Sequence, residues 1–309
     1  MSRKIALILF VLFLSACAGN ASPVAPTSSD LSISLVDGLD RTVTLSAPAQ
    51  RVVSLAAANT EILFAIGAGA QVVGRDSFSD YPPEAASVED IGGSFGEYDL
   101  EAILALQPDL VLAGEINSPE LVASLEDLGL TVFLLPNPSG LFEGLYTTLE
   151  TVGILTGHVS EAASLSESLR VRVDAVEKAS LSVTNIPDVY YELDATNPAA
   201  PYTAGVGTYV SRLIWLAGGR IITGGNYDAW ITISLEQLLV ADPDIIILGD
   251  AAYGETPEKV AARPGWDALT AVRTGQIFPI DDNLVSRPGP RLVDGLEALV
   301  ELIHPGLMK

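Results

Sequence analysis

Short aliphatic runs alternate with segments of helical periodicity along most of this chain. The aliphatic runs, such as residues 51–55, are bounded by glycine, proline or polar residues, which is typical of buried strands. Between them, apolar residues recur every three or four positions, as on one face of a helix. The predicted strands are residues 51–55, 72–74, 110–113, 131–135, 188–193 and 245–248, and the predicted helices are residues 60–66, 100–106, 119–128, 208–216 and 235–241. Strands that alternate with helices of this length pair in parallel through right-handed crossovers, so the predicted fold class is α/β.

Two segments depart from this alternation. Residues 31–36 and 41–45 alternate apolar and polar positions around Asp37-Gly38, which predicts a β-hairpin. Residues 159–183 contain no proline or glycine, and their apolar residues keep helical spacing throughout. They predict one continuous helix about 36 Å long, at the usual rise per residue.

The second half of the chain repeats a motif of the first. LEAILALQPDLVLA (residues 100–113) aligns without a gap with LEQLLVADPDIIIL (residues 235–248). Each copy indicates an amphipathic helix, a proline that ends it, an aspartate at the turn and a buried strand. The repeat predicts two Rossmann-like lobes with parallel sheets, residues 31–155 and 185–309, joined by one long rigid α-helix within residues 156–184. The alternative is one continuous sheet with a chance similarity.

The N-terminus is typical of an exported protein. A short basic segment precedes an unbroken apolar run, residues 5–14, which is too short to span a bilayer as a helix. LSAC (residues 14–17) then places small residues before the only cysteine of the chain, as in a bacterial lipoprotein signal. We therefore predict a signal peptide over residues 1–17, acylation of Cys17, and a flexible tether over residues 18–30. The alternative is an ordinary secretory signal with a chance cysteine.

The charge balance excludes several classes of function. With 39 acidic and 16 basic residues, the formal net charge is −23, and no basic stripe could follow a phosphate backbone. No nucleic-acid partner is therefore expected. An acidic surface is also repelled by anionic lipids, which leaves acylated Cys17 as the membrane anchor. The chain has only two histidines, His158 and His304, so neither a metal site nor a cofactor is expected.

One motif favours an enzyme. Residues 92–96 (GGSFG) match G-x-S-x-G, which in hydrolases lies between an adjoining strand and helix and presents a nucleophilic serine. Here the next predicted helix begins only at residue 100, so a secreted α/β hydrolase is a distant alternative. Residues 205–207 (GVG) begin like a dinucleotide-binding loop, but Val210 replaces the third glycine. We therefore predict that the protein is not an enzyme.

Several longer segments resemble one family of binding proteins. They are VVSLAAANTEILFAIGAG (residues 52–69), DYPPE (80–84), YDLEAILALQPDLVLA (98–113), PYTAGVGTYVSRLIWLAGG (201–219), ISLEQLLVADPDIIIL (233–248), RPGWDALTAV (263–272) and SRPGPRLVDGLEAL (286–299). In this order they resemble the helical-backbone solute-binding proteins of ABC importers for cobalamin, ferric siderophores and haem. The resemblance covers the chain from about residue 41 onward. It implies a ligand held between the lobes, an importer permease as partner, and a place in the periplasm or on the outer face of the cell membrane.

The resemblance also implies roles for individual residues. Glu101 and Glu236, the matched acids of the repeat, would dock into arginine pockets of the permease; the alternative is a helix-dipole role. Family position assigns the ligand to the aromatic residues Phe78, Phe95, Tyr98, Tyr202, Tyr227 and Trp230. Arg287 and Arg291 would meet a ligand carboxylate, or Arg291 would form an ion pair at a loop-to-helix junction. Because aromatic residues outnumber cations, the expected ligand is a corrinoid such as cobalamin, with a ferric siderophore or haem as the alternative.

Overall fold

A computed structural model describes residues 32–93, 96–136, 140–225 and 228–308. The predicted signal peptide, the tether and Cys17 lie outside these ranges, as do Phe95 and Tyr227. No helix within the described ranges is both long enough and apolar enough to cross a bilayer. Residues 32–309 group into one compact unit, and two sheets form its framework.

Five strands form the first sheet, and all of them pair in parallel. Their spatial order is β5 (Glu89–Asp90), β4 (Val72–Arg75), β3 (Val52–Ser54), β6 (Leu110–Ala113) and β7 (Val132–Leu134). The parallel pairing confirms the prediction. Every residue of β3 and β6 is buried, which explains why their sequences are continuous aliphatic runs instead of alternating ones. The predicted hairpin is formed by β1 (Ile33–Val36) and β2 (Thr42–Leu45), which pair antiparallel.

Helices connect the strands of the first sheet. They are α1 (Ala57–Ala65), α2 (Leu100–Ala105) and α3 (Pro119–Asp127), with short 3₁₀ turns η1 (Gly69–Gln71) and η2 (Pro83–Ser87). The three predicted helices of this part of the chain are thus confirmed. Residues 32–156 are called the first lobe below, after the sheet that they contain.

The second sheet is mixed. Its strands follow the order β11 (Trp230–Thr232), β9 (Tyr202–Ala204), β8 (Asp188–Asp194), β12 (Ile245–Leu248) and β13 (Ile277–Pro279), and β10 (Arg220–Ile221) pairs with β8. β10, β8, β12 and β13 pair in parallel, as the sequence predicts. β9 pairs antiparallel with both β8 and β11, which the sequence pattern did not predict. The short loop 195–201 between β8 and β9 explains this, because a parallel pair needs a longer crossover.

Residues 188–308 are called the second lobe, and their described part contains six helices beside the second sheet. They are α6 (Tyr209–Leu216), α7 (Leu235–Ala241), α8 (Pro257–Ala261), α9 (Thr270–Thr274), α10 (Asn283–Ser286) and α11 (Leu292–Ile303), with 3₁₀ turns η4 (Gly249–Tyr253) and η5 (Trp266–Ala268). The sequence predicts α6 and α7. It did not predict α11, the longest of these six helices, whereas α8, α9 and α10 carry too few turns for a periodic pattern.

The repeated motif folds in the same way in both lobes. α2 and β6 form the first copy, and α7 and β12 form the second. In each copy the aspartate after the proline accepts a hydrogen bond from the backbone at the start of the neighbouring strand. Asp109 accepts from Arg51 N–H and Asp244 accepts from Asp188 N–H, both at 2.9 Å. The Pro-Asp pair therefore fixes where the central strands of each sheet begin.

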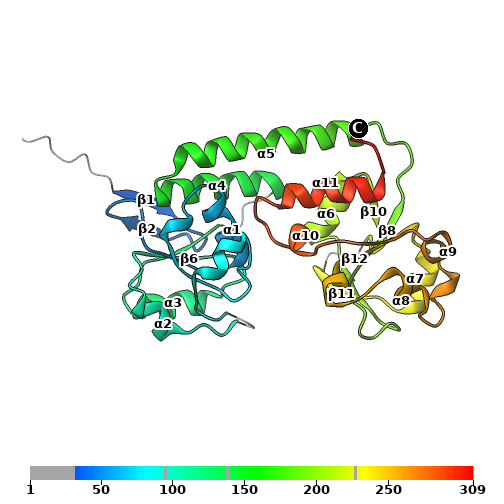
Figure 1. Ribbon diagram of the computed structural model, residues 1–309, viewed down its shortest axis with the longest axis horizontal. Helices are drawn as coiled ribbons and strands as arrows, with labels where there is room; N and C mark the ends of the chain where they lie inside the picture. Colours follow the sequence, from blue (N-terminus) through cyan, green and yellow to red (C-terminus); the bar gives the residue numbers. More distant parts are fainter. Residues whose placement is uncertain (1–31, 94–95, 137–139, 226–227, 309) are drawn as a thin grey trace, which may run out of the picture. The chain divides into compact units, whose positions relative to one another are not determined.

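The predicted long helix is α5 (Val159–Ser180), which leads from the first lobe to the second. α4 (Leu141–Thr156) precedes it and packs against it, and the sequence analysis did not predict α4. Figure 1 shows α5 extending over both lobes, with α4 beneath its first half and α11 beneath its second. The connector is therefore a packed group of helices and not an isolated rod.

Candidate ligand-binding site

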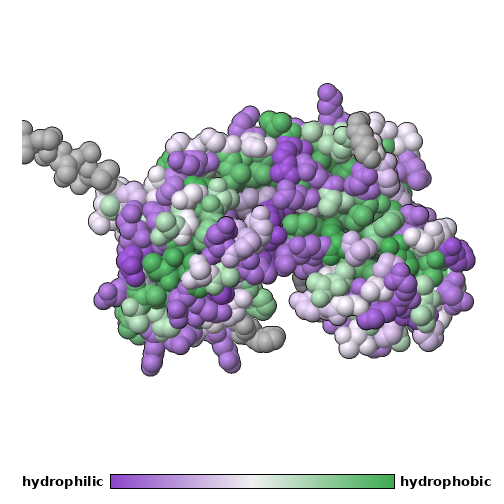
Figure 2. Space-filling view, viewed as in Figure 1, coloured by the Kyte–Doolittle hydropathy of each residue, from purple (hydrophilic) through white to green (hydrophobic). Residues whose placement is uncertain are grey.

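A cavity of about 820 Å³ lies between the two lobes. The surface view shows a hollow between them on the side away from α5 (Figure 2). The first lobe contributes the segments after β6 and β7 together with α1 and the start of α4. The second lobe contributes the loop before α6, the start of β11 and the segment after α10. Pockets of about 300–1,000 Å³ bury most of a drug-sized ligand, so this cavity suits a bulky one.

The ends of the strands explain the place of the cavity. In a parallel sheet the carboxyl ends of the strands lie at one edge, and the loops that follow them bind ligands. Gly114 and Glu115 follow β6, Pro136 follows β7, and all three line the cavity. Next to the opposite wall, a Cβ added at Gly205 would lie 1.9 Å from the carbonyl oxygen of Asp228, so only glycine fits there. The Gly205 N–H donates to the carbonyl oxygen of Ala229 at 2.7 Å, which holds the loop before α6 against the residue that precedes β11.

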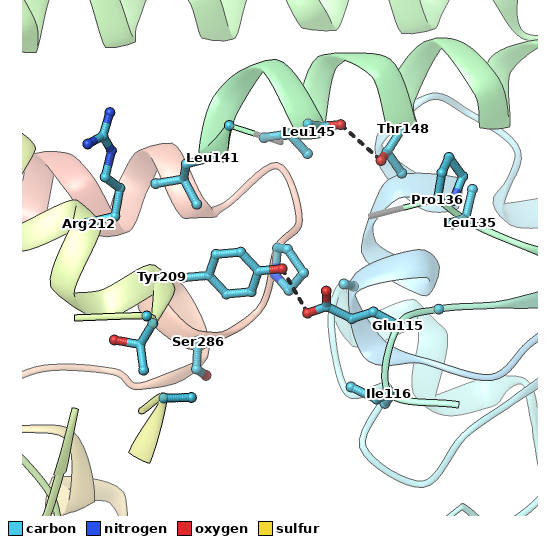
Figure 3. Close-up of a pocket in the computed structure, with 18 of the residues that line it drawn as sticks. Glu115, Ile116, Leu135, Pro136, Leu141, Leu145, Thr148, Tyr209, Arg212 and Ser286 are labelled. Carbon is cyan, nitrogen blue, oxygen red and sulfur yellow. Dashed lines mark hydrogen bonds between the residues drawn. The ribbon is translucent and has the colours of Figure 1, made fainter. Parts of the chain in front are cut away.

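A hydrogen bond crosses the cavity between the two lobes. Tyr209, the first residue of α6, points towards Glu115 of the other lobe, and its Oη donates to Oε1 at 2.7 Å (Figure 3). Tyr209 is half-buried, and its burial, followed by the bond to the Glu115 carboxylate, raises the pKa of the hydroxyl above its ordinary value. Tyr209 is therefore a neutral donor at physiological pH, and Glu115 is the acceptor.

The described wall of the cavity carries little other charge. Glu115 and Arg212 are its only two charged residues within the ranges that the structure describes. The Arg212 guanidinium points away from the Glu115–Tyr209 bond (Figure 3), and its Cζ lies 4.6 Å from the centre of the Trp215 ring. Trp230 on β11 is half-buried and adds an aromatic surface. Such a wall suits a bulky ligand with little net charge.

A cluster of ion pairs joins the lobes beside the cavity. Glu61 lies on α1 of the first lobe, and its side chain is only 2% exposed. Arg291 of the second lobe donates two hydrogen bonds to it, from Nε to Oε2 at 2.9 Å and from Nη2 to Oε1 at 2.6 Å. Arg287 donates from Nη1 to the same Oε1 at 3.3 Å and to Oδ1 of Asp80 at 2.7 Å. These four residues are called the interlobe clamp below.

The surroundings favour the charged forms of two members of the interlobe clamp, Arg291 and Asp80. The hydrogen bond to Glu61 raises the pKa of Arg291, whose guanidinium also stacks on Tyr81 with 3.8 Å between Cζ and the ring centre. Burial by itself would raise the pKa of Asp80, but the hydrogen bond and the charge of Arg287 outweigh it and hold this pKa below its ordinary value. The residues on either side of Arg287 line the cavity, so the clamp lies directly behind the cavity wall.

The two predicted arginine ligands are thus paired with protein acids. Neither Arg287 nor Arg291 lines the cavity, and both contact Glu61. Arg291 stands just before α11, so it forms the ion pair at a loop-to-helix junction that the sequence analysis gave as its alternative role.

The predicted aromatic residues occupy different places. Trp230 lines the cavity. Tyr98 is held within the first lobe, where its hydroxyl donates to a backbone carbonyl at 2.8 Å and accepts from an amide at 2.7 Å. Phe78 and Tyr202 are 52% and 42% exposed, and neither lines the cavity. The other two predicted aromatic residues lie outside the described ranges.

Glu101 and Glu236 occupy matching places in the two lobes. Each is an exposed residue in the first turn of its helix, α2 or α7. Figure 1 places both helices on the side away from α5. Other residues cap these helices: Asp99 caps α2, and Ser234 and Gln237 form a capping box on α7. Neither glutamate is therefore needed to begin its helix.

The G-x-S-x-G segment, which favoured a hydrolase, does not lie between an adjoining strand and helix as it does in hydrolases. β5 ends at Asp90 and α2 begins only at Leu100, so the G-x-S-x-G segment does not join an adjacent strand and helix. His158 Nδ1 lies 3.1 Å from a backbone carbonyl oxygen at the end of α4, and His304 Nε2 lies 3.0 Å from one after α6. Across the described ranges, no group of three or more histidine, cysteine or acidic residues could hold a metal ion.

Sequence reasoning missed Glu115, Tyr209 and Arg212. Glu115 comes two residues after the predicted strand 110–113, and this place at the carboxyl end of a strand is the signal that points to it. Tyr209 and Arg212 lie on a predicted helix, where no local pattern separates a residue that faces a cavity from one that faces solvent.

Comparison with known proteins gives a consistent result. Residues 52–284 match the family model for periplasmic binding proteins. An uncharacterized ABC transporter substrate-binding lipoprotein of Bacillus subtilis is 28% identical over 311 residues, which cover 98% of this chain and 97% of the relative. The crystal structure of the periplasmic vitamin B12-binding protein of Vibrio cholerae has a TM-score of 0.71 and 26% identity, and the match covers 83% of this chain and 97% of that one. A periplasmic haem-binding protein of Roseiflexus sp. RS-1 has a TM-score of 0.74 and 26% identity, with coverage of 84% and 99%.

The interlobe clamp generates a prediction about stability. Glu61→Gln should lower the free energy of unfolding by about 2–4 kcal/mol, because two largely buried arginines would lose their charged acceptor. Chemical denaturation at pH 7 measures this change. The matched control is Glu143→Gln, which removes an exposed ion pair with Arg170 and should cost less than about 1 kcal/mol. Equal losses in the two variants would contradict a stabilising role for the clamp.

Proposed function

Because the chain belongs to the periplasmic binding protein family, we propose that it is an extracytoplasmic solute-binding protein that delivers a corrinoid, such as cobalamin, to an ABC importer. The observation that carries this proposal is the cavity of about 820 Å³ between the lobes. Its described wall combines apolar side chains, hydroxyl groups and Trp230 with two charged residues. Such a wall holds a bulky ligand by excluding water from apolar faces and by a few polar contacts.

A corrinoid suits this wall for two reasons. Its ring is broad and has apolar faces, which an aromatic side chain such as Trp230 can cover. Its edge carries neutral amide groups, whose N–H can donate to a hydroxyl oxygen such as that of Thr148 in the cavity. The similarity to the vitamin B12-binding protein of Vibrio cholerae supports this choice. Haem is the second candidate, favoured by the similarity to the haem-binding protein, but it brings two carboxylates to a described wall whose one cation is Arg212.

The ligand is tested by titration of the purified protein with cyanocobalamin, haem and a ferric hydroxamate, followed by calorimetry and tryptophan emission. Trp230→Ala should weaken cobalamin binding by on the order of 1–3 kcal/mol, because an aromatic anchor would no longer cover the ring. Trp215→Ala is the control, since Trp215 is 62% exposed and does not line the cavity. Haem binding without cobalamin binding would overturn the corrinoid proposal. Equal affinity of the two variants would place the ligand elsewhere.

We further propose that a lipid on Cys17 anchors the protein at the membrane. The motif before Cys17 supports this, as does the similarity to a substrate-binding lipoprotein of Bacillus subtilis. Cys17→Ser should abolish fatty-acid labelling and release the protein from the membrane fraction, because serine has no thiol to carry the lipid. Labelling that persists in the variant would contradict the anchor.

Glu101 and Glu236 are proposed to dock the protein onto the permease. Both are exposed, both lie in the first turn of a helix on the side away from α5, and neither serves as a cap. A single acid in each lobe gives two matching charges, and a permease with two related subunits could pair with both through arginines. The ligand cavity does not include either residue.

The docking proposal predicts normal ligand binding with failed transport. The double variant Glu101→Ala/Glu236→Ala should keep its ligand affinity and lose only about 0.3–1 kcal/mol of stability per site from the helix dipole. Uptake by the reconstituted importer should be lost. The matched control is Glu120→Ala/Glu258→Ala, which removes first-turn acids of α3 and α8 and should transport normally. Intact uptake in the first double variant would rule the docking role out, and lost ligand binding would place the two acids in the binding site instead.

A further inference from the structure

Arg212 on α6 differs from the other arginines of the described ranges. Each of the others donates at least one hydrogen bond to a carboxylate or to a backbone carbonyl oxygen. Within the ranges that the structure describes, Arg212 donates no hydrogen bond and forms no ion pair, and its guanidinium lies over the Trp215 ring instead. In a chain with 39 acidic residues, an arginine without an acidic partner calls for a physical reason.

The place of Arg212 supplies a reason. Arg212 follows Tyr209 by one turn of α6 and lines the cavity between the lobes. The indole of Trp215 offers no acceptor to the guanidinium, because the only polar group of an indole is an N–H donor. The N–H groups of Arg212 therefore stay available at the cavity. A guanidinium presents such donors as a planar fork, which binds the oxygens of a phosphate or a carboxylate in pairs.

Two acids of α5 are the alternative partners of Arg212. A smaller cavity of about 240 Å³ is lined by Arg212 together with Asp174 and Glu177. Neither acid forms an ion pair with Arg212, and both are exposed. Pairing between exposed charges is weakened by water and salt, so it contributes little. An anion that excludes water from Arg212 in the larger cavity is the stronger partner.

A bulky ligand in the larger cavity removes water from Arg212. Burial of an unpaired guanidinium is costly, whereas burial against an anion forms charge-assisted hydrogen bonds. The protein has a formal net charge of −23, which repels anions at long range, so an anionic group needs a cation that faces it. Arg212 is the one cation of the described wall, and its guanidinium points away from the Glu115–Tyr209 bond (Figure 3). The described wall therefore suits a ligand with a single anionic group, placed away from this bond.

We propose that Arg212 is a specificity-determining residue, which binds the one anionic group of an otherwise neutral ligand. This inference rests on the proposed function of the cavity and adds the part of the corrinoid that is selected. The amide groups of cobalamin are neutral, and one phosphodiester joins its nucleotide to the side chain of the ring. Arg212 binds this phosphodiester, and it thereby distinguishes complete corrinoids from those that lack the nucleotide.

The test compares cyanocobalamin with dicyanocobinamide, a corrinoid that lacks the phosphodiester and the nucleotide, in calorimetric titrations of the purified protein. The wild type should bind cyanocobalamin at least about tenfold more tightly than dicyanocobinamide. Arg212→Gln should weaken the binding of cyanocobalamin at least about tenfold and change that of dicyanocobinamide by less than about twofold, because only the partner of the phosphodiester is lost. Arg212→Lys keeps the charge without the planar fork and should recover part of the lost affinity.

Two controls separate anion binding from general effects of charge and from structure. Arg170→Gln removes an equal charge beside the smaller cavity, and because Arg170 does not line the larger one, the variant should keep the wild-type preference. Arg212→Gln should also keep the denaturation midpoint of the wild type, since no hydrogen bond is lost. A lowered midpoint together with unchanged cyanocobalamin binding would assign Arg212 to Asp174 and Glu177 instead.

Each outcome of the titrations decides one point. Equal binding of the two corrinoids by the wild type, or equal weakening of both in Arg212→Gln, would overturn the role of Arg212. A wild-type protein that binds haem but neither corrinoid would overturn the corrinoid proposal, and weaker or unchanged haem binding in Arg212→Gln would still decide whether Arg212 binds an anion. Failure of all three ligands to bind the wild type would overturn both.

Discussion

A buried acid of one lobe, held by two arginines of the other, gives the cavity a defined width. Charges removed from water are stable only when their partners stay in place, so the pairing of Glu61 with Arg287 and Arg291 strongly favours one arrangement of the lobes. The clamp lies directly behind the cavity wall, and α5 joins the lobes on the side away from the hollow. The clamp and α5 thus connect the lobes at separate places, in addition to the Glu115–Tyr209 bond across the cavity, and these connections together shape the cavity.

The two lobes share a framework but contribute differently to the site. Asp109 and Asp244 fix the central strands in the same manner, and the carboxyl end of β6 brings Glu115 to the cavity. The second lobe adds the antiparallel strands β9 and β11, which have no counterpart in the described first sheet, and β11 brings Trp230. An acid therefore faces the gap from one lobe and an aromatic ring from the other. The site is asymmetric although its framework is repeated.

The sequence predicts six strands of the two sheets, five helices, the hairpin and α5, because each has a local signal, either a continuous aliphatic run or a helical or alternating period. It does not reveal α4, whose glycines and β-branched threonines disfavour a helix in isolation. Packing overrides that preference: a Cβ at Gly153 would lie 2.6 Å from Ala162 of α5, so glycine lets the two helices approach closely. The sequence also does not reveal which residues pair in the clamp or in the Glu115–Tyr209 bond. Arg291 and Glu61 are 230 positions apart, and Tyr209 and Glu115 are 94 positions apart, so each pair meets only through the tertiary fold.

α5 runs for 22 residues without proline or glycine, so a large swing of the lobes would have to break its backbone hydrogen bonds. The fold therefore resists a change in the spacing between Glu101 and Glu236 when a ligand enters the cavity. If these acids are the docking points, an importer that sensed only their spacing would accept loaded and unloaded carriers equally. Unloaded carriers would occupy the importer as competitors, and transport would depend on the loaded fraction of the carrier pool more than on its total amount.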